Sequence, residues 1–280
     1  MKTYDTGSNL LAYESFGSEE GQPLVFLHGA TADHASMENA FERFFQGLDG
    51  KYRRIYIDLP GHGESGHSLL RANMKALLED VGAFLCGNFK RPPCLVGYSM
   101  GGFLALKLAE KTHFPSLFLI APPMYSDKKR VSRPRELSFI TDELNEGERK
   151  SADPRYLLLA VKRTAETLKR YRANLVTGFS PGRWFYQTSL FRNAAAENMT
   201  IRPGRIASDT TFLAGRQDLL VGYRDQFEFS SKLKFSEYHS FSDCGHFLPF
   251  ECTQFEELFR HWLDRCVTEV RRGKSGSRAK

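Results

Sequence analysis

Short strand-like runs alternate along the chain with longer stretches in which apolar residues recur at helical spacing. The strand-like runs lie at residues 23–27, 54–58, 94–96, 116–121 and 210–215. The helical stretches lie at residues 37–48, 69–84, 103–111 and 255–270. Continuous apolar runs of this length are typical of strands covered on both faces. The alternation therefore predicts an α/β fold with a mostly parallel central sheet and helices on both faces.

Weaker patterns complete this sheet at both ends of the chain. Residues 3–16 alternate loosely and favour one or two short edge strands, and residues 238–241 are expected to form the last strand. Asp33 precedes the first helical stretch and is a candidate N-cap, because a side-chain oxygen there accepts from a backbone N–H of the first turn.

Residues 123–204 interrupt the alternation. This stretch is charged and mostly helical in pattern, and residues 155–172 are expected to form one long helix. It follows a predicted strand, so it should lie at the carboxyl ends of the strands, where open α/β sheets bind ligands. The aromatic residues of this stretch cluster at Phe179, Trp184, Phe185, Tyr186 and Phe191.

Composition restricts the class of protein. The chain has 280 residues, of which 41% are hydrophobic and 26% charged, as in soluble globular proteins. It contains no apolar run long enough to span a bilayer and no apolar signal core near Met1, so neither membrane association nor export is expected. Five scattered cysteines without a C-x-x-C pair predict free thiols in the cytoplasm, with neither zinc nor a disulfide framework.

The net charge of +6 comes largely from two basic clusters. One comprises residues 128–130 with Arg133 and Arg135, and the other is the segment 271–280. Such clusters can bind an anionic partner, or they can be a solvated surface and a disordered tail. The second interpretation is favoured, because the tail lacks interleaved aromatic residues, and no nucleic-acid partner is expected.

Ser99 lies at the centre of a Gly-x-Ser-x-Gly motif at residues 97–101. An apolar run precedes the motif and a helical pattern follows it. A serine at a sharp strand-to-helix turn projects its hydroxyl away from the sheet, and Gly97 and Gly101 are needed because side chains there would collide. The positive end of the following helix would face an anion formed at the serine. These features predict that Ser99 is a nucleophile.

Asp218 and His246 are the candidate acid and base for this nucleophile. Asp218 follows the strand at residues 210–215 after a short turn, and His246 follows the last predicted strand. A serine hydroxyl needs a histidine to accept its proton, and the histidine needs a carboxylate to fix its tautomer. The chain order Ser99, Asp218, His246 is the order found in α/β-hydrolases.

Other histidines and carboxylates are poorer candidates by position. His113 and His261 lie on predicted helices, and His28 is expected to stabilise the loop that follows its strand. Asp58 ends a strand but enters a tight Pro-Gly-His-Gly turn, which indicates a structural role. The remaining histidines lie in predicted loops, namely His34, His62 and His67, or in the last predicted strand, namely His239. Of the remaining carboxylates, Asp209 precedes the strand at 210–215 and Asp225 is expected in the helix that follows it.

Two backbone N–H groups are expected to form an oxyanion hole. Met100, the residue after the nucleophile, supplies one of them, and Ala30, in the loop after the strand at residues 23–27, supplies the other. In hydrolases of this kind each donor contributes roughly 10²–10³ in turnover.

Together these motifs resemble those of the α/β-hydrolase fold superfamily, of the fold-1 type. The matching segments are His28-Gly29, residues 58–65, residues 97–102, residues 215–218 and Gly245-His246. The resemblance implies a core made of residues 1–122 and 205–270, a mobile helical cap made of residues 123–204, and a basic flexible tail at 271–280.

The resemblance implies a serine hydrolase that cleaves a small ester or related acyl compound through an acyl-enzyme. Epoxide hydrolases and haloalkane dehalogenases of this fold use an aspartate as nucleophile, unlike Ser99. Phe103 stands where the menaquinone-synthesis lyases of the family tend to carry an arginine. A carbon–carbon bond hydrolase or lyase and a non-catalytic ligand receptor remain alternatives.

No cofactor or metal is expected, the partner is a small-molecule substrate, and the protein is expected to be a monomer or a homodimer. Substrate-binding residues stay unassigned. The basic cluster could receive a carboxylate-bearing substrate, or the aromatic residues of the cap could line an apolar acyl pocket.

Overall fold

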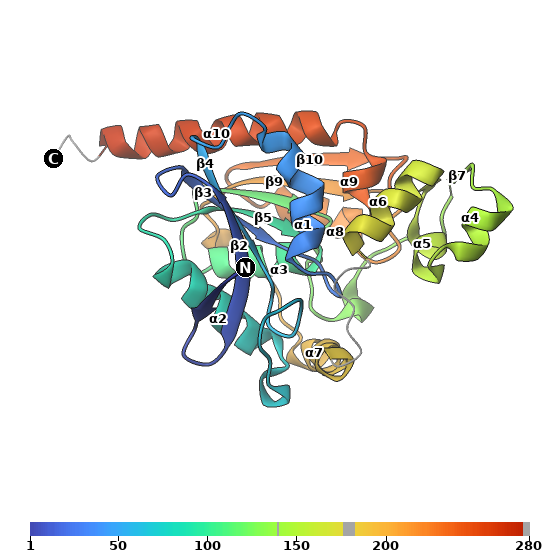
Figure 1. Ribbon diagram of the computed structural model, residues 1–280, viewed down its shortest axis with the longest axis horizontal. Coiled ribbons are helices and arrows are strands. Elements are labelled where there is room, and N and C mark those ends of the chain that lie inside the picture. The colour runs from blue at the N-terminus through green and yellow to red at the C-terminus, as the bar shows by residue number, and fades with distance from the viewer. Residues whose placement is uncertain (139, 176–182, 277–280) are drawn as a thin grey trace.

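The computed structural model describes residues 1–138, 140–175 and 183–276, and these residues are organised around a twisted sheet (Figure 1). The strands of this sheet are β1 (Lys2–Asp5), β2 (Leu10–Gly17), β3 (Gln22–Leu27), β4 (Tyr52–Ile57), β5 (Cys94–Tyr98), β6 (Ser116–Ile120), β9 (Asp209–Gly215) and β10 (Ser236–Phe241). Their spatial order is β1-β2-β4-β3-β5-β6-β9-β10. From β4 to β10 all neighbours are parallel, and β2 is antiparallel to both β1 and β4. The predicted mostly parallel sheet is therefore confirmed.

Helices cover both faces of the sheet. One face packs against α1 (His34–Phe41) and α10 (Phe255–Gly276), and the other against α2 (Met74–Gly87), α3 (Met100–Ala109) and α8 (Tyr223–Ser230). Trp262 of α10 is fully buried, and its indole N–H donates to the Ser116 hydroxyl at 2.7 Å. This bond satisfies the only polar atom of a large apolar side chain and fixes α10 against β6.

The starts of the early helices depend on their caps. Asp33 accepts a hydrogen bond from the Ser36 N–H at 3.3 Å, so the predicted N-cap is confirmed. The helix predicted over residues 69–84 begins only at Met74, because Asn73 accepts from the Ala76 N–H at 2.8 Å and so defines the first turn. A short 3₁₀ turn, Leu69–Arg71, precedes this cap.

The single helix predicted over residues 155–172 is wrong. The structure has α5 (Pro154–Leu159), then the short strand β8 (Lys162–Arg163), then α6 (Ala165–Leu175). The Val161 N–H donates at 2.6 Å to the carboxylate of Glu251, far away in the sequence. The Thr164 hydroxyl accepts from the Thr167 N–H at 3.1 Å, which favours a new helix start. Tertiary contact and a local cap together override the helical periodicity.

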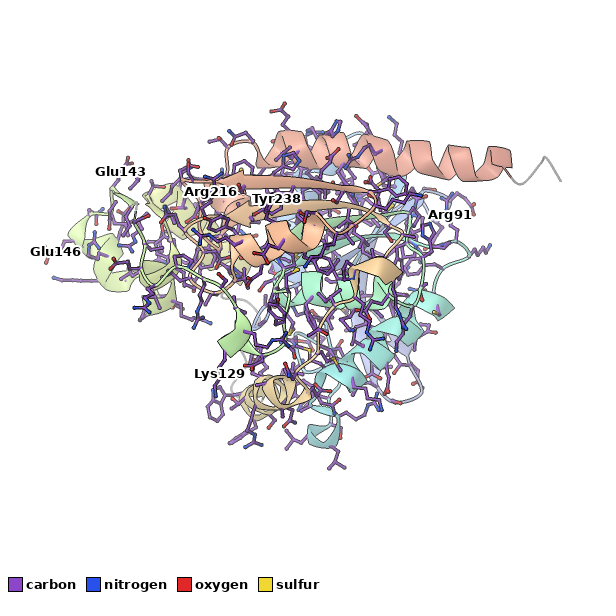
Figure 2. The ribbon with its side chains drawn as sticks, turned by 180° about the vertical axis from the view of Figure 1, so that it is seen from behind. Arg91, Lys129, Glu143, Glu146, Arg216 and Tyr238 are labelled. Carbon is purple, nitrogen blue, oxygen red and sulfur yellow. The ribbon has the colours of Figure 1, made fainter. Side chains whose placement is uncertain are left out.

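The residues between β6 and β9 lie beyond the carboxyl ends of the parallel strands. They include α4 (Glu146–Ser151), α5, α6 and α7 (Trp184–Glu197), and β7 (Thr141–Asp142) pairs with β8. Arg91, which precedes β5, and Glu146 of α4 lie at opposite ends of the molecule (Figure 2). This segment, residues 123–204, is called the insertion below.

Helix α10 continues to Gly276, past the predicted end at residue 270. The tail predicted to be flexible over residues 271–280 is therefore helical up to Gly276, and residues 277–280 lie outside the described residues. The arginines at 271 and 272 have a high intrinsic helix propensity, and no proline stops the helix. Among the residues that the structure describes, no helix combines the length and the apolar character needed to cross a bilayer.

Candidate active site

Ser99 occupies a strained turn between β5 and α3. Its φ of 50° and ψ of −115° place a non-glycine residue in a sparsely populated region of backbone space. The Ser99 N–H donates to the Ile120 carbonyl of the neighbouring strand at 2.8 Å, which holds the turn against the sheet. The side chain is thereby presented at the amino end of α3.

The flanking glycines permit this turn for a steric reason. A Cβ at Gly97 would lie 2.6 Å from the Cα of Gly102, and a Cβ at Gly101 would overlap the carbonyl oxygen of Leu27. Both obstacles are backbone atoms, so neither can move aside cheaply. The collision predicted for side chains at these two positions is confirmed.

His246 and Asp218 are hydrogen-bonded to each other. The His246 Nδ1 lies 2.7 Å from the Asp218 Oδ2, and both side chains are almost fully buried. The other carboxylate oxygen of Asp218 accepts from the N–H groups of Leu220 at 2.7 Å and Val221 at 3.0 Å. A carboxylate held by these donors can orient the imidazole and stabilise its protonated form.

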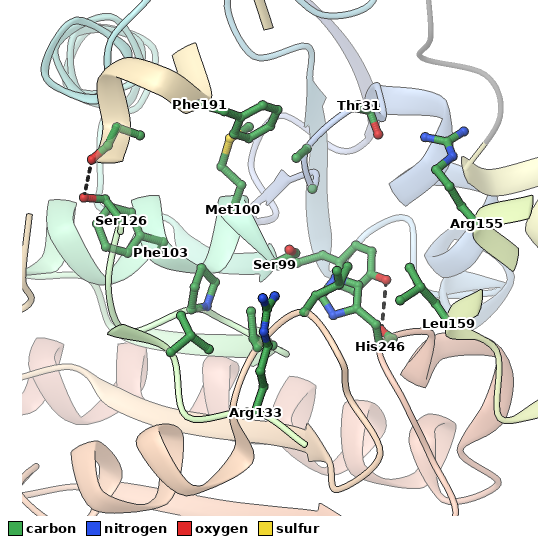
Figure 3. A pocket seen from close by; sticks show the side chains of 18 of the residues that line it. Thr31, Ser99, Met100, Phe103, Ser126, Arg133, Arg155, Leu159, Phe191 and His246 are labelled. Carbon is green, nitrogen blue, oxygen red and sulfur yellow. Dashed lines mark hydrogen bonds between the residues drawn. The ribbon is translucent and has the colours of Figure 1, made fainter. Parts of the chain in front are cut away.

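Ser99 and His246 line one pocket, into which both side chains point (Figure 3). The Tyr98 hydroxyl donates to the backbone carbonyl of His246 at 3.0 Å, and the two rings lie 5.3 Å apart. The residue before the serine therefore holds the histidine loop beside the serine turn. The structure thus brings together all three residues of the predicted triad, although they lie on three separate segments of the sequence.

The two residues predicted to supply the oxyanion hole also line this pocket. Ala30 belongs to the loop after β3, and Met100 begins α3 directly after the serine. The β3 loop approaches the serine closely, since a Cβ at Gly29 would lie 3.4 Å from the Cβ of Ser99. Both predicted donors therefore lie on segments that adjoin the nucleophile.

His28 makes hydrogen bonds that stabilise its loop. Its Nε2 accepts from the Leu59 N–H at 3.0 Å, so Nδ1 carries the proton and donates to the Gly29 carbonyl at 2.7 Å. Burial lowers the pKa of His28, and it lowers that of the neighbouring His62 to about 3. Both rings are held neutral and are fully buried, as a structural role requires.

The other residues judged poorer candidates for the acid or the base from their place in the sequence occupy structural or surface positions. Asp58 is buried, and its carboxylate accepts from the backbone and ring of His34 and from the Glu64 N–H. His261 is exposed on α10 as predicted. His113, predicted on a helix, lies in the exposed loop after α3.

The pocket has a volume of about 410 Å³, within the range of roughly 300–1,000 Å³ typical of small-molecule sites. Its walls combine the core, including Ser99 and His246, with the insertion, including Arg133, Arg155 and Phe191. The walls are mainly apolar, and the two arginines are their permanently charged side chains among the residues that the structure describes.

The aromatic cluster of the insertion divides between several environments. Phe191 lines the pocket, and Tyr186 is buried in the core. Trp184 and Phe185 are exposed on α7, whereas Phe179 lies outside the described residues. The sequence alone could not separate these residues, because all of them lie in one polar, helical stretch.

Glu251 is a residue of the site region that the sequence analysis missed. Its buried carboxylate accepts from the N–H groups of Gly245 at 2.7 Å and Val161 at 2.6 Å. Burial raises its pKa even though these hydrogen bonds favour the ionised form. No motif marks a glutamate of this kind, because its partners lie 6 and 90 positions away.

A family model described as the alpha/beta hydrolase family matches residues 24–259. The match covers most of the chain, and the chain belongs to this family. A solved alpha/beta superfamily hydrolase from Oenococcus oeni PSU-1 superposes with a TM-score of 0.78 at 24% identity, over 95% of this chain and 100% of the other. At this identity the superposition confirms the fold alone.

Curated relatives match only over part of their length. The chain is 37% identical over 105 residues to the dihydrolipoyllysine-residue acetyltransferase component of an acetoin cleaving system from Pseudomonas putida, covering 38% of this chain and 27% of that protein. It is 31% identical over 132 residues to the pimeloyl-[acyl-carrier protein] methyl ester esterase of Vibrio vulnificus, covering 45% of this chain and 48% of that protein. The matched region thus spans less than half of either relative. The family match and the similarity to an esterase support the interpretation that this protein is a hydrolase. They do not identify its substrate.

Proposed function

We propose that this protein is a carboxylesterase-like serine hydrolase that cleaves a small ester through an acyl-enzyme. The observation that carries the proposal is the 2.7 Å hydrogen bond between His246 and Asp218, made at a pocket that Ser99 also lines. A serine in a strained turn, a histidine and a buried carboxylate have one well-known joint use, which is nucleophilic acyl transfer.

In the proposed first step, the Ser99 hydroxyl attacks the carbonyl carbon of the ester while His246 Nε2 accepts the hydroxyl proton. Asp218 keeps the proton on Nδ1 and stabilises the imidazolium that forms. The negative charge develops on the former carbonyl oxygen, and the backbone N–H groups of Met100 and Ala30 would donate to it. The imidazolium then protonates the departing alkoxide, and the alcohol leaves.

In the proposed second step, water attacks the acyl-enzyme. His246 now takes a proton from the water and returns it to the Ser99 oxygen as the acid product departs. The same residues serve in both steps, and the reaction needs no oxidant, reductant or metal.

The insertion is proposed to act as a cap over this chemistry. Arg155 of α5 and Phe191 of α7 line the same pocket as Ser99, so a substrate in the pocket would contact both the insertion and the core. A covered, mainly apolar pocket strengthens the electrostatic contacts on which the transition state depends.

The test is a rate comparison across p-nitrophenyl esters of increasing acyl length, with wild type beside Ser99→Ala. We expect turnover by the wild type, a loss of at least roughly 10³-fold in kcat for the variant, and an unchanged circular dichroism spectrum. Labelling of Ser99 by a fluorophosphonate, detected by intact mass, checks the nucleophile without any choice of ester.

Each contrary result has a distinct meaning. Labelling without turnover of any ester would favour a more particular reaction, such as carbon–carbon bond cleavage. Neither labelling nor turnover, together with tight ligand binding, would favour a receptor. Equal turnover by wild type and Ser99→Ala would overturn the assignment of the nucleophile.

A further inference from the structure

Two arginines lie on the wall of a pocket that is otherwise mainly apolar. Arg133 precedes α4 and Arg155 lies on α5, so both come from the insertion (Figure 3). In Figure 3 the guanidinium group of Arg133 points toward the part of the pocket where Ser99 lies. A cation among apolar walls is a polar group of the kind that fixes the orientation of a ligand.

The two arginines differ in whether a carboxylate of the protein already pairs with them. Arg155 forms two contacts with the Asp153 carboxylate, at 3.1 Å and 3.4 Å. Among the residues that the structure describes, no carboxylate lies within ion-pair distance of Arg133. The N–H donors of the Arg133 guanidinium are therefore available to a carboxylate from outside the described residues, such as one on a ligand.

The backbone beside Arg133 is fixed to the β9–α8 region. The Ser132 N–H donates at 2.7 Å to the carboxylate of Asp225 on α8. The Ser132 carbonyl packs so closely against Gly222 that a Cβ on that glycine would overlap its oxygen. The arginine thus projects from an anchored position, although the side chain itself is long.

A second anchor holds the same segment further along. The Gln217 side-chain oxygen accepts from the Ser138 N–H at 2.9 Å and from its hydroxyl at 3.1 Å. Gln217 directly precedes Asp218, the carboxylate that pairs with His246. The segment that carries Arg133 is therefore attached to the loop that carries the candidate acid, which limits how far its backbone can move from the reacting groups.

We propose that Arg133 recognises a carboxylate on the substrate, and hence that the preferred substrate is an ester that also carries a free carboxylate. A guanidinium group binds a carboxylate through two parallel hydrogen bonds, a geometry that favours a carboxylate over a neutral group. Arg133 is exposed to solvent at the pocket wall, so a substrate carboxylate can reach it. The proposal rests on the proposed hydrolase function and narrows it to anionic esters. Arg133 is a specificity residue here and takes no part in the proton transfers.

The carboxylate can lie on the acyl side or on the alcohol side of the ester, and the test includes both. The acyl-side probe is mono-p-nitrophenyl adipate, compared with its neutral methyl ester. The alcohol-side probe is 3-carboxyphenyl butyrate, compared with its methyl ester. For each pair the quantity measured is the ratio of kcat/KM for the anionic ester to that for the neutral ester.

We expect wild type to prefer the anionic member of at least one pair by about tenfold, and Arg133→Gln to reduce that ratio to about one. The pair that shows the preference identifies the side on which the carboxylate lies. Arg135→Gln is the matched control, since Arg135 is exposed on the same segment but is not among the residues that line the pocket, so its loss should leave the ratio unchanged. A preference that persists in Arg133→Gln, or that wild type lacks, overturns the proposal.

A binding measurement separates this proposal from the proposed chemistry. Adipate, for the acyl side, and 3-hydroxybenzoate, for the alcohol side, are titrated calorimetrically into Ser99→Ala and into Ser99→Ala carrying Arg133→Gln. We expect the Kd of at least one of the two acids to rise by about tenfold in the double variant, whether or not any ester is turned over. Equal Kd values for both acids, or no binding of either acid to either protein, contradict the role of Arg133 and leave the hydrolase test unaffected.

Discussion

The buried carboxylate of Glu251 accepts a hydrogen bond of 2.7 Å from the backbone N–H of Gly245, the residue that precedes His246. Its other oxygen accepts at 2.6 Å from the N–H of Val161, between α5 and α6. Lys162 adds a second link, because its ammonium group donates to the Glu251 carbonyl at 2.7 Å and to Asp243 at 2.6 Å. The loop that carries the candidate base is thus tied to the insertion.

We expect Glu251→Gln to reduce both stability and turnover. A neutral amide has one acceptor oxygen, so it can serve Gly245 or Val161 but leaves the other buried N–H unpaired. Such a defect costs about 1–3 kcal/mol in the free energy of unfolding. A displaced His246 loop should also lower kcat by roughly tenfold or more, with a smaller change in KM.

Urea unfolding and ester kinetics check this prediction, with Glu256→Gln as the control. Glu256 forms a surface ion pair with Arg260 one turn along α10, so its loss should change stability by less than about 0.5 kcal/mol. If Glu251→Gln behaves like Glu256→Gln in both assays, Glu251 does not position the histidine loop.

Asp218→Asn tests the other partner of His246. An amide that donates to Nδ1 would favour the wrong imidazole tautomer, so we expect kcat to fall by about 10⁴-fold with little change in the folded structure. Stopped assays with p-nitrophenyl esters and a thermal melt measure the two effects. Asp264→Asn, an exposed change on α10, should keep the wild-type rate. A loss of less than tenfold in Asp218→Asn would mean that Asp218 does not orient the histidine.

The candidate triad could be predicted from sequence because each residue has a local signature. Ser99 lies between Gly97 and Gly101, where a side chain would collide with nearby backbone atoms. The two glycines mark the tight turn within a few residues of the serine. Asp218 and His246 follow the strands β9 and β10, and parallel strands bring their carboxyl ends to one edge of the sheet.

Features that depend on contacts distant in sequence could not be predicted. Helical periodicity continued over residues 155–172, and it is broken by a carboxylate at position 251. In the sequence Arg133 is one of several similar residues in a basic cluster. Its place in the pocket wall and the anchoring of Ser132 to Asp225 distinguish it, and both are properties of the fold. Both the break in the predicted helix and the position of Arg133 depend on contacts between the insertion and residues distant in sequence. A local sequence pattern does not indicate such contacts.

His34 and Asp58 predict a pH dependence of stability. The hydrogen bond to Asp58 raises the pKa of His34 above its usual value of 6.5. Burial alone would raise the pKa of Asp58, but the hydrogen bonds from His34 and Glu64 outweigh it and lower that pKa below 3.8. The contribution of His34 to stability is complete below pH 6.5 and is lost as the pH rises through the raised pKa of His34. That from Asp58 is complete above 3.8 and is lost as pH falls through its lowered pKa.

We therefore expect His34→Gln to lower the free energy of unfolding by about 1–3 kcal/mol near pH 5.5, and by less near pH 8.5. The backbone N–H of His34 keeps its 2.7 Å bond to Asp58, so the change isolates the imidazole. Urea unfolding at the two pH values measures this difference. His113→Gln, at an exposed loop position, should give the wild-type profile. An equal loss at both pH values would show that the charge of His34 is not involved.

Gly101→Ala is expected to destabilise the protein through the serine turn. The added Cβ would overlap the carbonyl oxygen of Leu27, a backbone atom of the central strand β3. Either α3 or β3 must shift, which by the usual cost of overpacking lowers the free energy of unfolding by about 1–3 kcal/mol. The shift also displaces Ser99, so turnover per folded molecule should fall. Gly204→Ala is the matched control, because no atom lies within 4 Å of its Cβ position. A Gly101→Ala variant as stable as Gly204→Ala in urea unfolding would mean that the turn relaxes more easily than its packing indicates.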